Sequence, residues 1–114
     1  MTNDQMAVLW HGTAYLPKLR LLPREEVQAI ALAASDLSMS TPLHLAGSRK
    51  FDVKGWGQAS GSQVTALMVF GLWVLCGEDE EKAAPLLADW PIKEVLIFTG
   101  EIASSDFIQA RIDN

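Results

Sequence analysis

The longest apolar run in this 114-residue chain extends from Ala66 to Cys76 and is broken only by Gly71. A bilayer-spanning helix needs roughly 20 such residues, so this run is too short to cross a membrane. A helix that lacks a polar face has no side suited to water. We therefore expect Val64–Cys76 to form a central helix that the rest of the chain covers, with Gly77 ending it.

A second helix is predicted to begin at Pro23, because proline suits a first helical turn, where its missing N–H would have had no partner. Glu25 and Glu26 follow and complement the positive end of the helix dipole. Apolar residues then recur at helical spacing until Ser38, Ser40, Thr41 and Pro42 compete with the helix. The recurring residues are Val27, Ile30, Ala31, Ala34 and Leu37.

Residues 46–62 hold four of the eight glycines and read as a loop with one short strand inside it. The strand is predicted at residues 50–54, where charged and apolar residues alternate and Phe51 and Val53 would face inward. Gly55-Trp56-Gly57 then reads as a turn. Either Ser60 or Ser62 would cap the central helix.

The first 22 residues allow two interpretations. Residues 7–10 and 15–22 resemble two short strands joined by a turn at His11-Gly12, and Leu19 and Leu21 alternate with basic residues. Pro17 would then lie at a strand edge or start. For residues 7–10 the alternative is a short N-terminal helix capped by Asn3 or Asp4.

The C-terminal third is predicted to contain a helix over residues 78–89, in which Pro85 either causes a kink or begins a second short turn. A strand or a helix is predicted over residues 92–99. A last helix would begin at Ser104 or Ser105. Together these segments predict a helix-rich α+β fold with about four helices and a small sheet of two to four short strands. An all-α fold is the alternative. The length of 114 residues suits one globular domain over residues 1–114.

Charge is distributed unevenly along the chain. The formal net charge is −5, yet residues 18–54 hold six basic against four acidic residues, whereas residues 76–114 hold three basic against nine acidic ones. The acidic part should repel nucleic acid and anionic membranes. The only cysteine gives no disulfide framework, and the short apolar stretch near the N-terminus does not suit a signal peptide, so we expect a soluble cytoplasmic protein.

No catalytic or metal-binding pattern is found in the sequence. Cys76 closes the most apolar run, where burial raises a thiol pKa, so a structural role is favoured over a nucleophilic one. His11 and His44 lack the close spacing of metal ligands, and no cofactor motif occurs. One alternative function remains open, a small-ligand or enzyme site at the Gly-rich segment Gly55–Ser62, with either histidine as its acid or base.

A DNA-binding regulator is the second alternative. Residues 25–46 faintly resemble a helix-turn-helix, but they lack the central turn glycine. The chain's pI near 4.8 makes nucleic-acid binding the less favoured hypothesis. The basic residues available for DNA contact would be Lys18, Arg20, Arg24, Arg49, Lys50 and Lys54.

The favoured function is a non-enzymatic interaction protein of the adaptor, inhibitor or immunity type, with a protein partner or a second copy of itself. Trp56, flanked by Gly55 and Gly57, has few neighbouring side chains to bury it, and tryptophan is enriched at the centres of protein interfaces. Trp90 follows an acidic segment and is a further candidate. Acidic residues Glu78, Glu80 and Glu81 would complement a basic partner.

Overall fold

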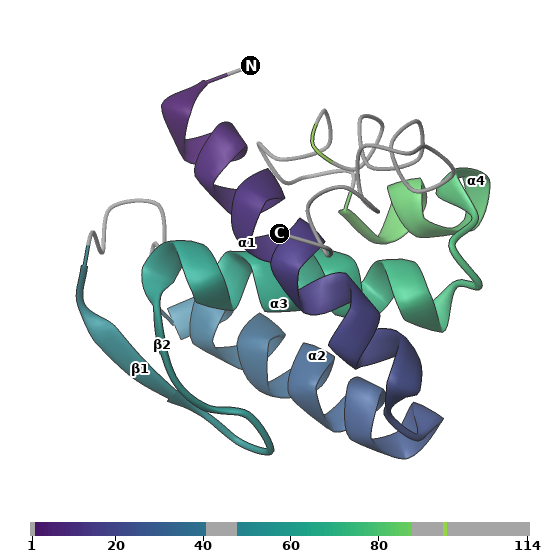
Figure 1. Ribbon diagram of the computed structural model, residues 1–114, viewed down its shortest axis with the longest axis horizontal. Helices are drawn as coiled ribbons and strands as arrows, with labels where there is room; N and C mark the ends of the chain where they lie inside the picture. The colour runs from purple at the N-terminus through teal and green to yellow at the C-terminus, as the bar shows by residue number, and fades with distance from the viewer. Residues whose placement is uncertain (1, 41–47, 88–94, 96–114) are drawn as a thin grey trace.

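A computed structural model describes residues 2–40, 48–87 and 95 of the chain (Figure 1). Its described part holds four α-helices, one short 3₁₀ helix and one two-stranded antiparallel sheet, so the predicted helix-rich α+β class is confirmed and the all-α alternative is not. The elements are α1 (Asn3–Leu21), α2 (Arg24–Ser40), β1 (Lys50–Val53), β2 (Gly57–Ser60), α3 (Gly61–Leu75), α4 (Glu80–Ala83) and η2 (Ala84–Leu87).

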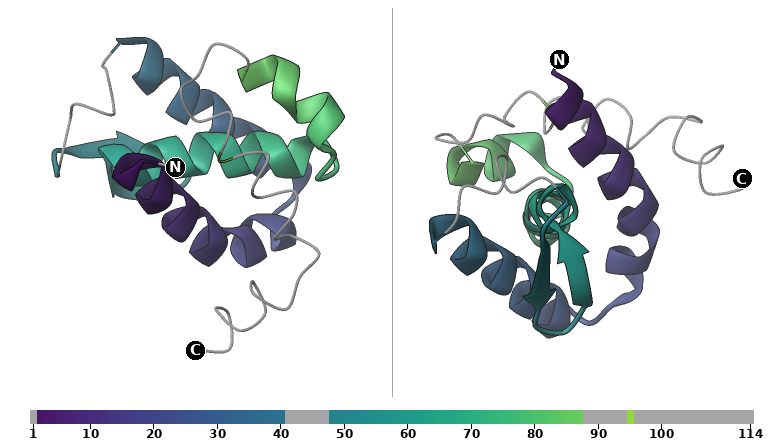
Figure 2. Two further views of the ribbon diagram at one scale, coloured as in Figure 1. Left: turned by 90° about the horizontal axis from the view of Figure 1, so that it is seen from above. Right: turned by 90° about the vertical axis from the view of Figure 1, so that its left-hand side faces the viewer.

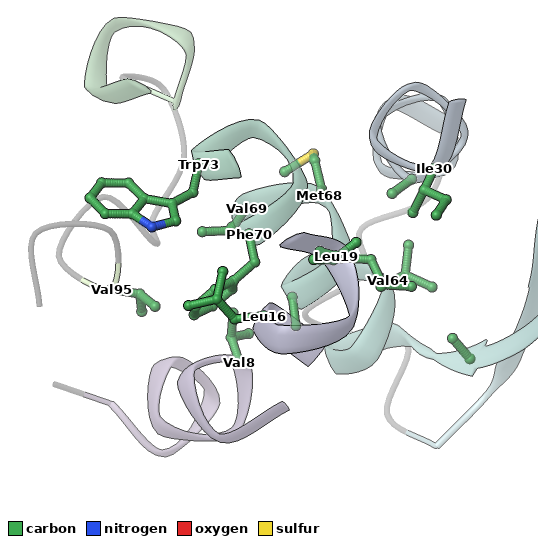
Figure 3. Close-up of a cluster of buried hydrophobic side chains, with 14 of the residues drawn as sticks. Val8, Leu16, Leu19, Ile30, Val64, Met68, Val69, Phe70, Trp73 and Val95 are labelled. Carbon is green, nitrogen blue, oxygen red and sulfur yellow. The ribbon is translucent and has the colours of Figure 1, made fainter. Parts of the chain in front are cut away.

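Helix α3 lies at the centre of the fold, as its apolar sequence predicts. Seen end-on in the right panel of Figure 2, it has α1, α2, the hairpin and the α4–η2 segment around it. Every residue from Val64 to Phe70 is buried, and so is Trp73. Figure 3 shows part of the core that α3 forms with side chains from α1 and α2. Because α3 is covered on several sides, the absence of a polar face costs it nothing.

Two glycines allow the neighbouring helices to approach α3 closely. A Cβ atom at Gly12 of α1 would overlap the ring of Phe70 in α3. A Cβ atom at Gly71 of α3 would lie 3.2 Å from the Cβ of Ala31 in α2. The two crossings therefore depend on small residues, one contributed by α1 and the other by α3 itself.

Both ends of α3 satisfy their backbone hydrogen-bonding groups. At the start, the Ser60 hydroxyl accepts from the Gln63 N–H at 3.4 Å, and the Gln63 side-chain oxygen accepts from the Ser60 N–H at 2.8 Å. At the end, the chain turns at Gly77, whose φ is +70°. The Gly77 and Glu78 N–H groups donate to the carbonyls of Val74 and Trp73, which is a Schellman motif. The predicted stop at Gly77 is therefore confirmed.

Helix α1 replaces the two strands predicted near the N-terminus, and that strand prediction was wrong. Thr2 caps the helix instead of Asn3 or Asp4, because its hydroxyl accepts from the Gln5 N–H at 3.2 Å and Gln5 completes the capping box. Pro17 lies inside the helix, where it removes one backbone donor. The right panel of Figure 2 shows α1 following a curved path around α3.

The glycine-rich segment forms a β-hairpin instead of the predicted loop with one strand. Strand β1 was predicted, with Phe51 and Val53 facing inward as expected, but its antiparallel partner β2 was not. Phe51 pairs with Ala59, and both are buried. The hairpin is the only sheet within the described residues, at the low end of the two to four strands predicted.

The acidic segment after α3 forms less helix than the sequence suggested. Helix α4 covers Glu80–Ala83, and the following 3₁₀ turn Ala84–Leu87 contains Pro85. Of the two outcomes predicted at Pro85, the structure therefore has the second short turn. Val95 is buried. The other predictions for residues 88–114, including Trp90 and the C-terminal helix, lie outside the described residues.

Candidate interaction surface

The hairpin turn holds Trp56 against α1. The Trp56 N–H donates to the Val53 carbonyl at 2.9 Å, and Gly55 has a φ of +88° at the third position of this turn, as a type II turn requires. The Trp56 side chain is half-buried and packs against the core. The sequence prediction that Trp56 belongs to a binding surface is untested, but the ring already has neighbours in this chain.

Those neighbours are aromatic and basic residues of α1. The rings of Tyr15 and Trp56 meet edge to face, with centroids 5.1 Å apart and planes at 72°. The Lys18 ammonium lies 4.4 Å from the centroid of the Trp56 ring, a cation–π distance. His11 stacks on Tyr15 with ring centroids 6.2 Å apart. We call His11, Tyr15, Lys18 and Trp56 the aromatic cluster.

Partial burial shifts the titration of two members of the aromatic cluster. It lowers the pKa of His11 below the usual 6.5, because desolvation penalises the imidazolium form. It raises the pKa of Tyr15 above the usual 10.0, because desolvation penalises the phenolate. Both shifts favour neutral rings at pH 7. The cluster therefore presents neutral aromatic edges and one ammonium group.

The acidic residues predicted to bind a partner contribute partly to the fold itself. Glu78 forms a bidentate ion pair with Arg20 of α1, in which Arg20 Nε lies 3.1 and 3.2 Å from the two carboxylate oxygens. Arg24 of α2 donates to the Leu75 carbonyl at the end of α3, at 3.0 Å. Glu80 and Glu81 lie in the first turn of α4, and Glu81 is exposed. Of the three acidic candidates, Glu78 is thus engaged within the chain.

The structure places Trp56 and Glu78 on different sides of α1. Trp56 contacts Lys18, and Glu78 contacts Arg20. Side chains two positions apart on a helix point in directions about 200° apart around its axis. The hairpin turn and the α3–α4 turn therefore flank the C-terminal half of α1. The predicted partner-binding residues in the described region do not form one cluster. Trp56 and Glu78 each contact α1, whereas Glu80 and Glu81 lie in α4, and Gly55 and Gly57 flank Trp56 in the hairpin.

The alternative enzyme site at residues 55–62 is not an open loop. Gly57–Ser60 is strand β2, and the capping box uses the Ser60 and Gln63 N–H groups, two of the donors that an anion at this helix start would need. His44, one of its two proposed acid–base residues, lies outside the described residues. Cys76, the predicted structural cysteine, is half-buried at the C-cap of α3. Among the described residues, no group of three His, Cys, Asp or Glu side chains gathers as a metal site would.

Four of the six basic residues proposed for DNA binding, including Arg24, interact with other residues of the chain. Lys18 lies on Trp56, Arg20 pairs with Glu78, and the Arg49 guanidinium lies 5.2 Å from the centroid of the Phe51 ring. They are spread over α1, α2 and the hairpin. The second helix of the helix-turn-helix resemblance would fall on residues 41–47, outside the described part of the chain.

One surface that the sequence reasoning missed is the outward face of α1. Met6, Trp10 and Leu21 are 50, 57 and 86% exposed, and the exposed Ala14 and half-buried Ala7 and Pro17 lie between them. At 100° per residue, these side chains form one stripe along the face opposite the core, about 22 Å long. We call these six residues the outer stripe of α1.

Helix α2 gives a useful contrast to the outer stripe. Its exposed face also carries large apolar residues, Leu32 at 57% and Met39 at 85%. The exposed Gln28 and Asp36 share that face, so the apolar residues are isolated from one another. Isolated exposed apolar residues are normal on protein surfaces, whereas a continuous apolar stripe points to a binding surface. The signal was present in the sequence as apolar residues at positions 6, 7, 10, 14, 17 and 21.

Comparison with known proteins adds no relative. The chain matches no protein-family description, no curated protein and no solved structure. Among the described helices, none combines the length and the apolar character that a membrane crossing requires.

Proposed function

We propose that this chain is a non-enzymatic interaction domain of the adaptor, inhibitor or immunity type, which binds a protein partner through the outer stripe of α1. The supporting observation is that α1 is apolar on both faces. Val8, Leu9 and Leu16 bury one face against the core, while Met6, Trp10 and Leu21 remain exposed on the other.

Hydrophobic burial drives most protein association, and large exposed apolar stripes are kept in soluble proteins where they serve binding. Tryptophan is also the residue most enriched among those that dominate interface energies. Trp10 therefore replaces Trp56 as the first candidate for such an anchor in the described region.

The residues predicted earlier remain part of this proposal in a supporting role. Trp56, with Gly55 and Gly57, borders the outer stripe through its contact with Lys18. The acidic residues Glu80 and Glu81 would attract a basic partner surface. The proposed participation of Trp90, the cytoplasmic location and the low affinity for nucleic acid stay predictions from the sequence.

The test is capture of partners by the full chain, immobilised and exposed to a lysate of its native host. We expect Trp10→Glu to abolish capture of proteins that the unmodified chain retains, because a charge in the stripe must be desolvated. Leu32→Glu on α2 is the matched control, since Leu32 and Trp10 are equally exposed, and it should leave capture unchanged. Equal capture by all three proteins would contradict a role for the outer stripe.

A further inference from the structure

We propose that the partner at the outer stripe of α1 is a second copy of this chain, whose α1 packs antiparallel to the first about a two-fold axis level with residue 12. This inference rests on the proposed function, because it names the occupant of the same stripe. Two properties of α1 support it, the sizes of the stripe residues and the placement of the charges beside them.

The spacing of the stripe suits a helix pair. Five residues of the stripe, at positions 7, 10, 14, 17 and 21, alternate steps of three and four residues, the spacing of the seam in two-stranded helical coils. An antiparallel pairing about residue 12 brings Trp10 against Ala14 of the second copy, and symmetry repeats the contact. A large side chain then meets a small one twice, which allows close packing of the two helices.

The charges beside the stripe also match in this arrangement. Asp4 and Lys18 lie on the same flank of the stripe, about 40° apart around the helix axis. In an antiparallel helix pair equivalent flanks meet. Asp4 of each copy then lies level with residue 20 of the other, about 3 Å along the axis from the Lys18 of that copy. In a parallel pair Asp4 would lie level with the second copy's Asp4, about 21 Å along the axis from either Lys18. Charge complementarity therefore favours the antiparallel arrangement.

The other flank carries no unmatched charge. Arg20 is the charged residue of α1 on that side, and its guanidinium is already paired with Glu78 of the same chain. A second copy therefore meets one neutralised flank and one self-complementary flank. Such a surface is isologous, as a two-fold dimer interface must be.

The first test is sedimentation equilibrium of the full chain over about 1–500 µM, a range that covers affinities typical of small dimers. We expect a concentration-dependent rise from the monomer mass of 12.5 kDa to twice that value. Trp10→Glu should raise the dissociation constant at least 100-fold, while Leu32→Glu leaves it unchanged. A monomer at every concentration would overturn the proposal.

A charge exchange tests the orientation. Asp4→Lys alone and Lys18→Glu alone should each weaken self-association about five-fold, because each places like charges together. An equimolar mixture of the two variants should restore it, since both contacts are then between opposite charges. Asp36→Lys on α2 is the control for a change of net charge. No recovery in the mixture would contradict the antiparallel arrangement.

Cysteine cross-linking tests the same geometry without relying on charge. In a Cys76→Ala background, Asn3→Cys protein should form a disulfide with Leu21→Cys protein, and neither should cross-link to itself. Positions 3 and 21 of one helix are about 27 Å apart, far beyond the reach of a disulfide. Cross-linking of each variant to itself would instead show parallel helices and overturn the proposal.

The outcomes separate this inference from the proposed function. A monomeric chain that still captures host proteins through Trp10 would retain the interaction domain and exclude the homodimer. A dimer insensitive to Trp10→Glu would place the interface elsewhere and overturn this proposal. If the monomeric chain also captured nothing through Trp10, both proposals would fail.

Discussion

Helices α1 and α3 both carry apolar residues on opposite faces, yet they occupy different environments. Helix α3 is buried on almost every side, and its Val64–Phe70 segment has no exposed residue. Helix α1 is buried on one face only, and its opposite face exposes Met6, Trp10 and Leu21. Apolar character alone therefore does not separate a central helix from one that carries an exposed binding face.

The difference follows from the positions of the two helices in the chain's packing. Helix α3 crosses both other long helices through Gly12 against Phe70 and Gly71 against Ala31. Helix α1 crosses α3 at Gly12 on its inner face. Among the described residues, no other helix crosses its outward face. The apolar residues of α3 stabilise the monomer, whereas we attribute those on the outer face of α1 to association.

The largest expected difference between the two helices is in stability. Phe70→Ala should lower the free energy of unfolding by about 3–5 kcal/mol, because it removes a fully buried ring from the core. Leu21→Ala in α1 should change it by less than about 0.5 kcal/mol. Urea unfolding at low protein concentration measures both without a contribution from association. A similar loss at the two sites would show that the outer stripe belongs to the monomer core.

A smaller loss of stability is expected from a change at Trp56, whose half-buried ring is intermediate between the buried core and the exposed stripe. Trp56→Ala should cost about 1–2 kcal/mol of stability, since the half-buried ring loses its contacts with Tyr15 and Lys18. Trp56→Phe is the control, because it keeps the edge-to-face ring contact. Stability unchanged by Trp56→Ala would return Trp56 to the role of an exposed binding residue.

The smallest expected effect is the pH dependence caused by His11. Its pKa is lowered in the folded state, so at pH values below about 6.5 the unfolded chain binds the proton more readily. The free energy of unfolding should therefore fall as the pH drops below that value, and be unaffected above it. His11→Gln should remove this part of the slope below about pH 6.5. An NMR titration showing a His11 pKa above 6.5 would contradict the sign.

Long periodic segments were predicted well from the sequence. Helices α2 and α3 and strand β1 lie where their patterns placed them, because caps, periodicity and packing agree there. Strand β2 was missed because its residues, Gly-Gln-Ala-Ser, have low strand propensity. It forms because the glycine turn returns the chain to pair with β1, which is a contact that local propensity does not contain.

The N-terminal error has a specific cause. The alternation of Lys18, Leu19, Arg20 and Leu21 predicts a strand with both leucines on one face. A run of only four residues is too short to distinguish a strand from a helix. In the structure Leu19 is fully buried and Leu21 is 86% exposed, so the leucines lie on different faces. A helix over these residues leaves a stripe of apolar side chains exposed to water. That exposed stripe is the candidate interaction surface.

The contact of Gly12 with Phe70 also has a consequence for how this chain can vary. The phenyl ring occupies the space where a side chain at residue 12 would project, so the two positions share one volume. A larger residue at position 12 becomes acceptable only after position 70 has become smaller, and the smaller residue alone leaves a cavity. Either substitution alone therefore destabilises the fold, although the two together need not. In natural descendants of this sequence, positions 12 and 70 should therefore change together or not at all.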